Sequence, residues 1–244
     1  MSNGTADSGF KYAGSELALF ETASNWKAYW SGQIRDYVRG DVLEAGAGAG
    51  ANTRLLANLA FDSWTCLEPD AALLVQIEPA PSRRHRSICG TIENLDPEMR
   101  FDAILYIDVL EHIEDDRAEM KRAAERLKPA GCLIVLAPAH PFLFTPFDSA
   151  IGHFRRYTRK SLQSVIPAGL ETRRLVYLDA AGMAASGANL LLLRSAMPTA
   201  AQVLTWDRLL VPVSRRIDRA LGWRAGKSVL GIWQRSRTYA EIKR

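Results

Sequence analysis

Short apolar, strand-like runs alternate with helix-like stretches through the first 138 residues of the chain. The strand-like runs lie at 41–45, 63–68, 85–89, 101–108 and 131–138, and the helix-like stretches lie at 52–59, 70–77 and 115–127. This alternation is typical of a parallel sheet with helices on both faces, because every parallel connection has to cross over the sheet.

The alternation changes after Pro138. A segment dense in Pro, Phe, His and Asp follows at 139–158, and a sixth strand-like run lies at 172–179. A helical region from 180 then precedes a last strand at about 227–234, and Pro212 should kink or split that helical region. We therefore predict an α/β fold with a Rossmann-like, seven-stranded, mostly parallel sheet and a helical insertion before the last strand.

We divide the chain into four parts on this basis. Residues 1–39 form an N-terminal helical lead-in or cap, in which Ser15 could begin a helix and Gly40 could end it. The other three parts are the Rossmann-like core at 40–179, the helical insertion at 180–222, and the last strand with its tail at 223–244.

Composition excludes some classes of protein. The chain has 244 residues, of which 48% are hydrophobic, so it can bury a sizeable core. We find no transmembrane segment and no signal peptide, since the longest apolar run in the C-terminal half is 190–193 and the N-terminus has no charged-then-apolar layout. The three cysteines lack paired spacing, which predicts reduced thiols and a cytoplasmic location.

Charge is distributed unevenly along the chain. The net charge is +4, but residues 1–150 are acidic and residues 151–244 are basic. A basic half is compatible with a site for anions, with contact to an anionic membrane surface, or with a solvated face that binds nothing. The sequence leaves these three alternatives open.

A glycine-rich turn follows the first strand. Gly46, Gly48 and Gly50 let the backbone turn tightly and approach a ligand, but their spacing is not the G-x-G-x-x-G of dinucleotide sites. Glu44 would repel a pyrophosphate, and its charge suits a cofactor with an amino group and a sulfonium. Glu68, at the end of the second strand, can accept hydrogen bonds from ribose hydroxyls.

Four ordered motifs resemble those of the class I (Rossmann-like) S-adenosylmethionine-dependent methyltransferases of the small-molecule type. They are VLEAGAGAG at 42–50, LEPD at 67–70, FDAILYIDVLEHIEDD at 101–116 and LKPAGCLIVLAPA at 127–139. The resemblance implies S-adenosylmethionine (SAM) as cofactor. The cofactor-binding residues that it implies are Glu44, Ala45, Gly46, Gly48, Asn52, Thr53, Glu68, Pro69, Thr91, Ile92, Asp108, Val109, Leu110 and His112.

Some of these assignments leave alternatives. Thr91 departs from the Asp that many members use to bind the adenine amine, so backbone groups and packing could hold the adenine instead. Asp108 could cap the following helix, and His112 could be a buried histidine of the core.

The segment 139–158 combines polar groups with phenylalanines, which is typical of a small-molecule pocket. Its candidate catalytic residues are His140, His153, Asp148 and Tyr157, with either histidine as a general base. The D-x-x-x-G-H-x-R-R-Y pattern at 148–157 resembles a subgroup of the same enzymes. In a structural alternative, Asp148 pairs with Arg155 or Arg156 and fixes the loop. Because His140, Asp148 and His153 lack a recognisable ligand spacing, we predict no metal site.

The leading hypothesis for function is methyl transfer from SAM to an O, N or C atom of a small or medium-sized acceptor, anionic or lipophilic in character. One alternative is a SAM-binding protein without methyltransferase activity. Another is a nucleic-acid methyltransferase, but the chain lacks a D/N-P-P-Y/F motif and we expect no nucleic acid partner. The helical insertion could be ordinary core, cover the acceptor, touch a membrane peripherally or form a homodimer.

Overall fold

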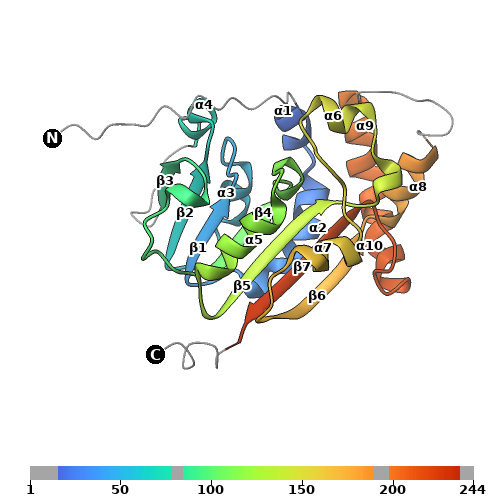
Figure 1. Cartoon of the computed structure of the whole chain (residues 1–244). Helices are drawn as coiled ribbons and strands as arrows, with labels where there is room; N and C mark the ends of the chain where they lie inside the picture. The colour runs from blue at the N-terminus through green and yellow to red at the C-terminus, as the bar shows by residue number, and fades with distance from the viewer. Residues whose placement is uncertain (1–15, 78–84, 189–197, 237–244) are drawn as a thin grey trace.

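Seven strands form one sheet in the order β3-β2-β1-β4-β5-β7-β6 (Figure 1). The computed structural model describes residues 16–77, 85–188 and 198–236. The strands are β1 Asp41–Ala45, β2 Ser63–Glu68, β3 His85–Cys89, β4 Phe101–Ile107, β5 Leu127–Pro138, β6 Leu170–Leu178 and β7 Ser228–Arg235.

The sheet is parallel except at β7. The strands β1 to β5 pair in parallel, and β7 pairs antiparallel with both β5 and β6. This topology confirms the predicted seven-stranded, mostly parallel sheet. Because β7 runs backwards, its first residues lie at the carboxyl end of β5, where the Ala139 amide donates a hydrogen bond to the Lys227 carbonyl at 2.7 Å.

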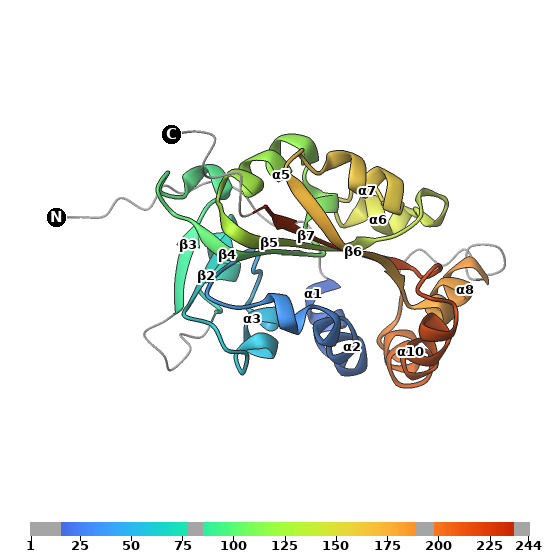
Figure 2. The ribbon, with the colours of Figure 1, turned by 90° about the horizontal axis from the view of Figure 1, so that it is seen from below.

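Helices cover both faces of the sheet. Figure 2 shows α5, α6 and α7 on one face and α1, α2, α3 and α10 on the other. The helices of the core are α3 Ala51–Leu56, α4 Ala71–Leu74, η2 Ile92–Asn94, η3 Leu110–His112, α5 Asp116–Glu125, η4 Pro141–Leu143, α6 Pro146–Ala150 and α7 Arg159–Val165.

Each face of the sheet has its own apolar core. Strand β4 shows why, because successive side chains of a strand point to opposite faces. Leu105 and Ile107 belong to the core beneath α2 and α3, whereas Ile104 and Tyr106 belong to the core beneath α5 and α7. All four side chains are buried, which is the reason that residues 103–107 of this central strand are apolar.

The N-terminal lead-in is two helices and a short turn rather than one helix. They are α1 Glu16–Glu21, α2 Ser24–Ile34 and η1 Arg35–Tyr37, while the predicted cap Ser15 lies outside the described residues. Asp207, from the distant insertion, caps α2 by accepting hydrogen bonds from the Asn25 amide at 3.1 Å and the Trp26 amide at 2.8 Å. The lead-in and the insertion are therefore joined by a buried carboxylate.

The insertion before β7 contains α8 Ala180–Ala188, α9 Ala200–Thr205, η6 Trp206–Leu210 and α10 Val211–Ala220. The segment η6 is a π-helix, and Pro212 follows in the first turn of α10. Proline has no amide hydrogen and clashes with the carbonyl four residues before it, so a widened turn at this place relieves the clash. The helical region thus changes type next to Pro212.

A second buried carboxylate joins α10 to β6 and α2. Asp218 accepts hydrogen bonds from the amides of Asp179 and Ala180, at 2.6 and 2.9 Å, and from the Tyr29 hydroxyl at 2.8 Å. These contacts fix the start of α8 against the end of β6. In the part of the chain that the structure describes, no helix has the length and apolar character needed to cross a membrane.

Replacing Asp207 by Ala should destabilise the protein, because two amides at the start of α2 and the Asn25 side chain lose their acceptor in a buried place. We expect the free energy of unfolding in urea to fall by about 1–3 kcal/mol. Arg208→Ala, at the exposed neighbouring position, is the control and should unfold as the wild type does. Equal stability of Asp207→Ala and wild type would contradict the capping role.

Candidate cofactor and acceptor site

The segments that the sequence analysis singled out meet at one edge of the sheet. The glycine turn follows β1, Pro69 follows β2, residues 108–112 follow β4, and residues 139–157 follow β5. These are the carboxyl ends of parallel strands, which lie together at the top of Figure 1. In open α/β sheets, ligands bind outside this edge.

The glycine turn has a conformation that requires glycine. Gly46, Gly48 and Gly50 have φ values of 64°, 55° and 79°. A Cβ atom on Gly46 would lie 2.6 Å from a methyl group of Val109, so the turn packs directly on the loop after β4. The turn therefore leaves its backbone open to a ligand and lies next to the 108–112 segment.

Glu44 is a buried carboxylate beneath this turn. Its Oε2 accepts hydrogen bonds from the Thr53 hydroxyl at 2.6 Å and from Trp64 Nε1 at 2.9 Å, whereas its Oε1 is buried and has no hydrogen-bond partner among the residues that the structure describes. Burial raises the pKa of Glu44 to about 7. An N–H donor with a positive charge would satisfy Oε1 and stabilise the carboxylate, so this residue fits the amino-bearing cofactor that the sequence implies.

Glu68 connects the end of β2 to the glycine turn. Its carboxylate accepts hydrogen bonds from the Gly48 amide at 2.8 Å and from the Asp70 amide at 2.9 Å. Asp70 in turn caps α4 by accepting from the Ala72 amide. The Glu68 oxygens are thus held beside the turn with lone pairs to spare, which is compatible with the ribose role that we predict for it.

Other predicted cofactor residues divide between the site edge and the core. Asn52 and Pro69 are half-buried, Thr91 is exposed, and Thr91 forms a capping box with Asn94 at the start of η2. Ala45, Ile92 and Leu110 are buried with the apolar cores. We therefore expect the backbone of Ile92 and Leu110, rather than their side chains, to face a ligand.

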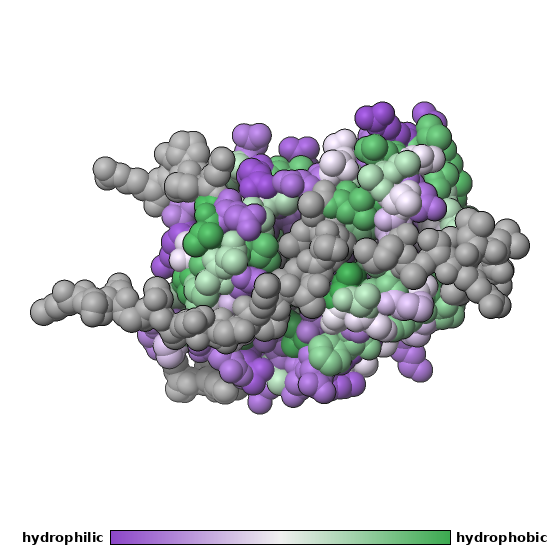
Figure 3. All heavy atoms as spheres, turned by 90° about the horizontal axis from the view of Figure 1, so that it is seen from above, coloured by the Kyte–Doolittle hydropathy of each residue, from purple (hydrophilic) through white to green (hydrophobic). Residues whose placement is uncertain are grey.

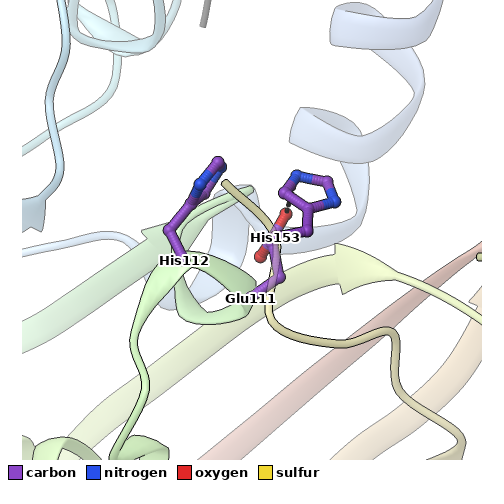
Figure 4. A group of neighbouring side chains, drawn as sticks. All are labelled: Glu111, His112 and His153. Carbon is purple, nitrogen blue, oxygen red and sulfur yellow. Dashed lines mark ion pairs between the residues drawn. The ribbon is translucent and has the colours of Figure 1, made fainter. Parts of the chain in front are cut away.

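Four polar residues gather around the segment after β4. Asp108, which has a φ of 54°, is followed by Glu111 and His112, and His153 arrives from the segment after β5. His153 Nε2 lies 3.9 Å from Glu111 Oε1, and the rings of His112 and His153 have centroids 4.5 Å apart (Figure 4). Figure 4 shows both rings and the carboxylate close to one another.

Burial disfavours charge throughout this group. It raises the pKa of Glu111 well above its usual range, with a further contribution from Asp108, and it lowers the pKa of His112 to about 4. Solvent reaches Asp108, yet enough protein surrounds this carboxyl group to raise its pKa to about 6. At neutral pH the imidazole of His112 is therefore neutral, with a lone pair on one ring nitrogen.

Asp148 holds His153 in place. This buried carboxylate accepts hydrogen bonds from Arg156 Nε at 2.7 Å and interacts with His153 Nδ1 at 2.9 Å. Burial alone would raise the pKa of Asp148, but the hydrogen bonds from His153 and Arg156 hold it well below its usual range. Of the two predicted pairings the structure has the one with Arg156, because Arg155 contacts Asp116 at 2.7 Å. Asp148 thus has the contacts of a positioning residue.

Tyr157 and His140 lie apart from this group. The Tyr157 side chain is buried, and its hydroxyl donates to Asp116 at 2.8 Å, so its contacts indicate a structural role. The His140 ring stacks between Phe142 and Tyr177, on the β6 side of the sheet. Its Nε2 is buried without a hydrogen-bond partner, and burial lowers its pKa. The structure therefore brings His153, but not His140, to the residues that follow β4.

Sequence reasoning missed Glu111 and Lys227. Glu111 lies between Leu110 and His112 in a quoted motif, so an acidic residue beside a histidine at a strand end was the available signal. Lys227 Nζ lies 3.6 Å from Asp179 Oδ2 and 3.5 Å from the centre of the Trp206 ring. Its position at the site edge depends on the antiparallel direction of β7, which the sequence pattern did not indicate.

Comparison with known proteins agrees with this geometry. Residues 43–133 match the family model described as "Methyltransferase domain". This region contains the glycine turn, Glu68 and the segment after β4, and it ends within β5. The chain therefore resembles this family over residues 43–133.

Curated relatives match over the same part of the chain. A ubiquinone biosynthesis O-methyltransferase of Bradyrhizobium sp. (strain ORS 278) is 36% identical over 101 residues, which is 38% of this chain and 38% of that protein. A demethylmenaquinone methyltransferase of Tropheryma whipplei (strain Twist) is 34% identical over 111 residues, or 44% and 46% of the two chains. The chain thus spans less than half the length of these relatives.

Solved structures resemble the fold over nearly its whole length. The N-methyltransferase NodS of Bradyrhizobium japonicum WM9, in complex with S-adenosyl-L-homocysteine, aligns with a TM-score of 0.59 at 13% identity and covers 92% of this chain and 94% of that one. An S-adenosylmethionine-dependent methyltransferase of Clostridium acetobutylicum ATCC 824 aligns with a TM-score of 0.54 at 13% identity and covers 91% and 95%. The fold is the class I methyltransferase fold.

Replacing Glu44 by Gln should stabilise the protein at about pH 8 but not at about pH 4. The pKa of Glu44 is 4.5 in the unfolded chain, which has the reference value, and about 7 in the fold. As the pH rises, the unfolded chain therefore loses this proton at a lower pH than the folded chain does. The free energy of unfolding of the wild type therefore falls as the pH rises from 4.5 to 7, by at most about 3 kcal/mol. The glutamine variant lacks this decline.

Thermal unfolding of both proteins across this pH range measures the effect. Asp62→Asn, at an exposed position, is the control and should follow the wild type. If the difference in Tm between Glu44→Gln and wild type does not grow with pH, burial of the Glu44 charge does not destabilise the fold.

Proposed function

We propose that the chain transfers the methyl group of SAM to a small or medium-sized organic acceptor, because residues 43–133 match a methyltransferase domain model and the fold is shared with methyltransferases of known structure. The observation that carries this proposal is Glu44, a buried carboxylate with one unpartnered oxygen beneath the glycine turn. A cofactor that carries an ammonium and a sulfonium supplies the donor and the positive charge that this carboxylate lacks.

The chain's own contribution to such a transfer is to position the two reactants. SAM supplies an activated methyl group, so the acceptor atom has to lie about 3 Å from that carbon and in line with its bond to sulfur. Glu44 and Glu68 bind and orient the cofactor on one side of Val109. Asp108 and His112 lie after β4, in the same segment as Val109, and the His153 ring meets His112 from the segment after β5. These three side chains can orient an acceptor hydroxyl and receive its proton.

The name of one of the two relatives specifies oxygen as the methylated atom, and both names point to quinone chemistry. The Bradyrhizobium relative is called a ubiquinone biosynthesis O-methyltransferase, and the Tropheryma relative a demethylmenaquinone methyltransferase. We infer an acceptor of related chemistry, which is a hydroxylated aromatic ring with lipophilic character.

The three free thiols, Cys66, Cys89 and Cys132, support the cytoplasmic location that we predict.

Binding of S-adenosylhomocysteine tests the proposed function directly. We expect the wild type to bind one equivalent by isothermal titration calorimetry, and Glu44→Gln to bind at least about tenfold more weakly because the carboxylate no longer balances the positive charge. Since the same substitution should stabilise the fold at about pH 8, weaker binding there could not result from unfolding.

Turnover is then measured as the release of S-adenosylhomocysteine from SAM in the presence of alkyl-substituted hydroquinones and catechols. Failure of the wild type to bind S-adenosylhomocysteine would overturn the proposal. Tight binding without turnover of any acceptor would instead support a SAM-binding protein without methyltransferase activity.

We also infer that α10 contacts an anionic membrane surface, where a lipophilic acceptor would be found. Large apolar side chains are exposed in a row four residues apart, with exposed fractions of 62% for Leu209, 43% for Val213, 37% for Ile217 and 47% for Leu221. Figure 3 shows hydrophobic and hydrophilic residues side by side on the face of the molecule that is seen from above. Exposed arginines flank the row, at Arg208, Arg215, Arg216 and Arg219. An amphipathic helix with this composition suits an interface with anionic lipid.

A double substitution, Leu209→Ser with Ile217→Ser, should reduce co-sedimentation with vesicles of phosphatidylcholine and phosphatidylglycerol by several-fold, because the inserted apolar area is lost. Val75→Ser is the matched control, since Val75 is 81% exposed on a different part of the surface. Equal sedimentation of the double variant and wild type, or equal binding to pure phosphatidylcholine, would contradict the membrane contact.

A further inference from the structure

Glu111, His112 and His153 place three metal-ligating groups together. One ligand atom from each residue lies within 4.8 Å of the other two, and the group brings a carboxylate and two imidazoles from two separate segments of the chain (Figure 4). Two ligand atoms bound to one zinc ion lie about 3.3 Å apart. Small side-chain rotations would therefore bring all three residues into one coordination sphere.

Glu111 is a buried carboxylate that a bound cation would satisfy. Its side chain is 1% exposed, and its Oε2 has no hydrogen-bond partner among the described residues. Its other oxygen lies 3.9 Å from His153 Nε2, which is too long for a hydrogen bond. A buried carboxylate that is left unsatisfied is costly, and binding a positive ion is one way to satisfy it.

Both histidines have a second partner that orients the ring. His153 Nδ1 lies 2.9 Å from Asp148 Oδ1, and Asp148 is fixed in turn by Arg156. An ionised carboxylate can only accept a hydrogen bond, so Nδ1 carries the proton and Nε2 faces Glu111. The backbone of Gly152 interacts with His112. Carboxylates and carbonyls that hold the far nitrogen of a histidine are the usual outer partners of metal-ligating histidines.

We propose that Glu111, His112 and His153 bind a divalent transition-metal ion, of the Zn²⁺ or Mn²⁺ class, with coordination positions left open. Two imidazole ligands disfavour Mg²⁺ and Ca²⁺, which prefer oxygen. Three protein ligands are also the number found in catalytic zinc sites, where a further position takes water or substrate.

The role of the ion, unlike its binding, rests on the proposed function. Glu111 and His112 follow β4 in the same segment as Val109, and His153 joins them from the segment after β5. Val109 packs on the glycine turn. An acceptor hydroxyl bound to the ion would be polarised toward its ionised form and oriented at the methyl donor. In that case the ion would lower the pKa of the acceptor hydroxyl, its proton would pass to solvent, which reaches this segment at Asp108, and His153 would act as a ligand instead of a general base.

Metal binding is measured on the tag-free full chain after treatment with a chelator. We expect isothermal titration calorimetry to show one equivalent of Zn²⁺ and of Mn²⁺ bound, and Mg²⁺ at least about tenfold more weakly. Glu111→Gln, His112→Gln and His153→Gln should each weaken Zn²⁺ binding at least about tenfold. The chain has four histidines, so His85→Gln and His140→Gln serve as matched controls that should bind as the wild type does.

Two further measurements complete the test. Cooperative thermal unfolding of each variant shows that it is folded, and Co²⁺ in place of Zn²⁺ reports the ligands through its visible absorption. Loss of metal binding in the three ligand variants with cooperative unfolding kept supports the site. No saturable metal binding by the wild type, equal loss in the His85 and His140 variants, or a thiolate-to-cobalt band would overturn it.

The role of the ion has a separate test. If the ion positions the acceptor, removal of metal should abolish turnover of hydroquinones and leave binding of S-adenosylhomocysteine unchanged. Full turnover without metal would overturn that role. Because cofactor binding is measured independently, failure of the metal site and failure of the proposed function give different results.

Discussion

Buried carboxylates without a matching positive charge define the carboxyl edge of this sheet. Glu44 lies beneath the glycine turn with one oxygen unpartnered, and Glu111 lies after β4 in the same condition. Burial raises the pKa of both side chains, so each is held in a form that it would not have in water. A fold keeps such unfavourable groups where a ligand relieves them, which is why these two residues, more than the glycines, indicate a binding site.

Asp148 differs from Glu44 and Glu111, because its buried carboxylate forms a salt bridge with Arg156. Here the carboxylate is fully satisfied, because Arg156, His153 and the Thr145 amide all donate to it or pair with it. It stabilises the long segment after β5 in one conformation and thereby brings His153 to the residues that follow β4. A segment of this length, in which η4 and α6 are short, would otherwise sample many conformations. The site is therefore shared between two strands, and Asp148 determines how they meet.

The parallel sheet and the position of the glycine turn could be predicted because they depend on local sequence. Apolar runs give the strands to within a few residues, and Gly46 with Glu44 stands directly at a strand end. The acceptor side depends on contacts between distant segments. His140 and His153 look alike in sequence, and only the packing against Tyr177 or against His112 separates them. Tyr157 is polar and lies in a promising motif, yet its hydroxyl bonds with Asp116 inside the core.

Contacts between distant segments also hold the helical insertion next to the sheet edge, although the insertion carries none of the sequence motifs. The antiparallel strand β7 returns the chain to the carboxyl end of β5, where Lys227 pairs with Asp179 and lies over Trp206 of η6. Asp207 and Asp218 then join the insertion to α2 through buried hydrogen bonds. These contacts place the amphipathic helix α10 at a fixed position relative to the sheet edge. If α10 contacts a membrane as we propose, a lipophilic acceptor would pass from that surface toward the residues after β4 while the protein stays in one orientation.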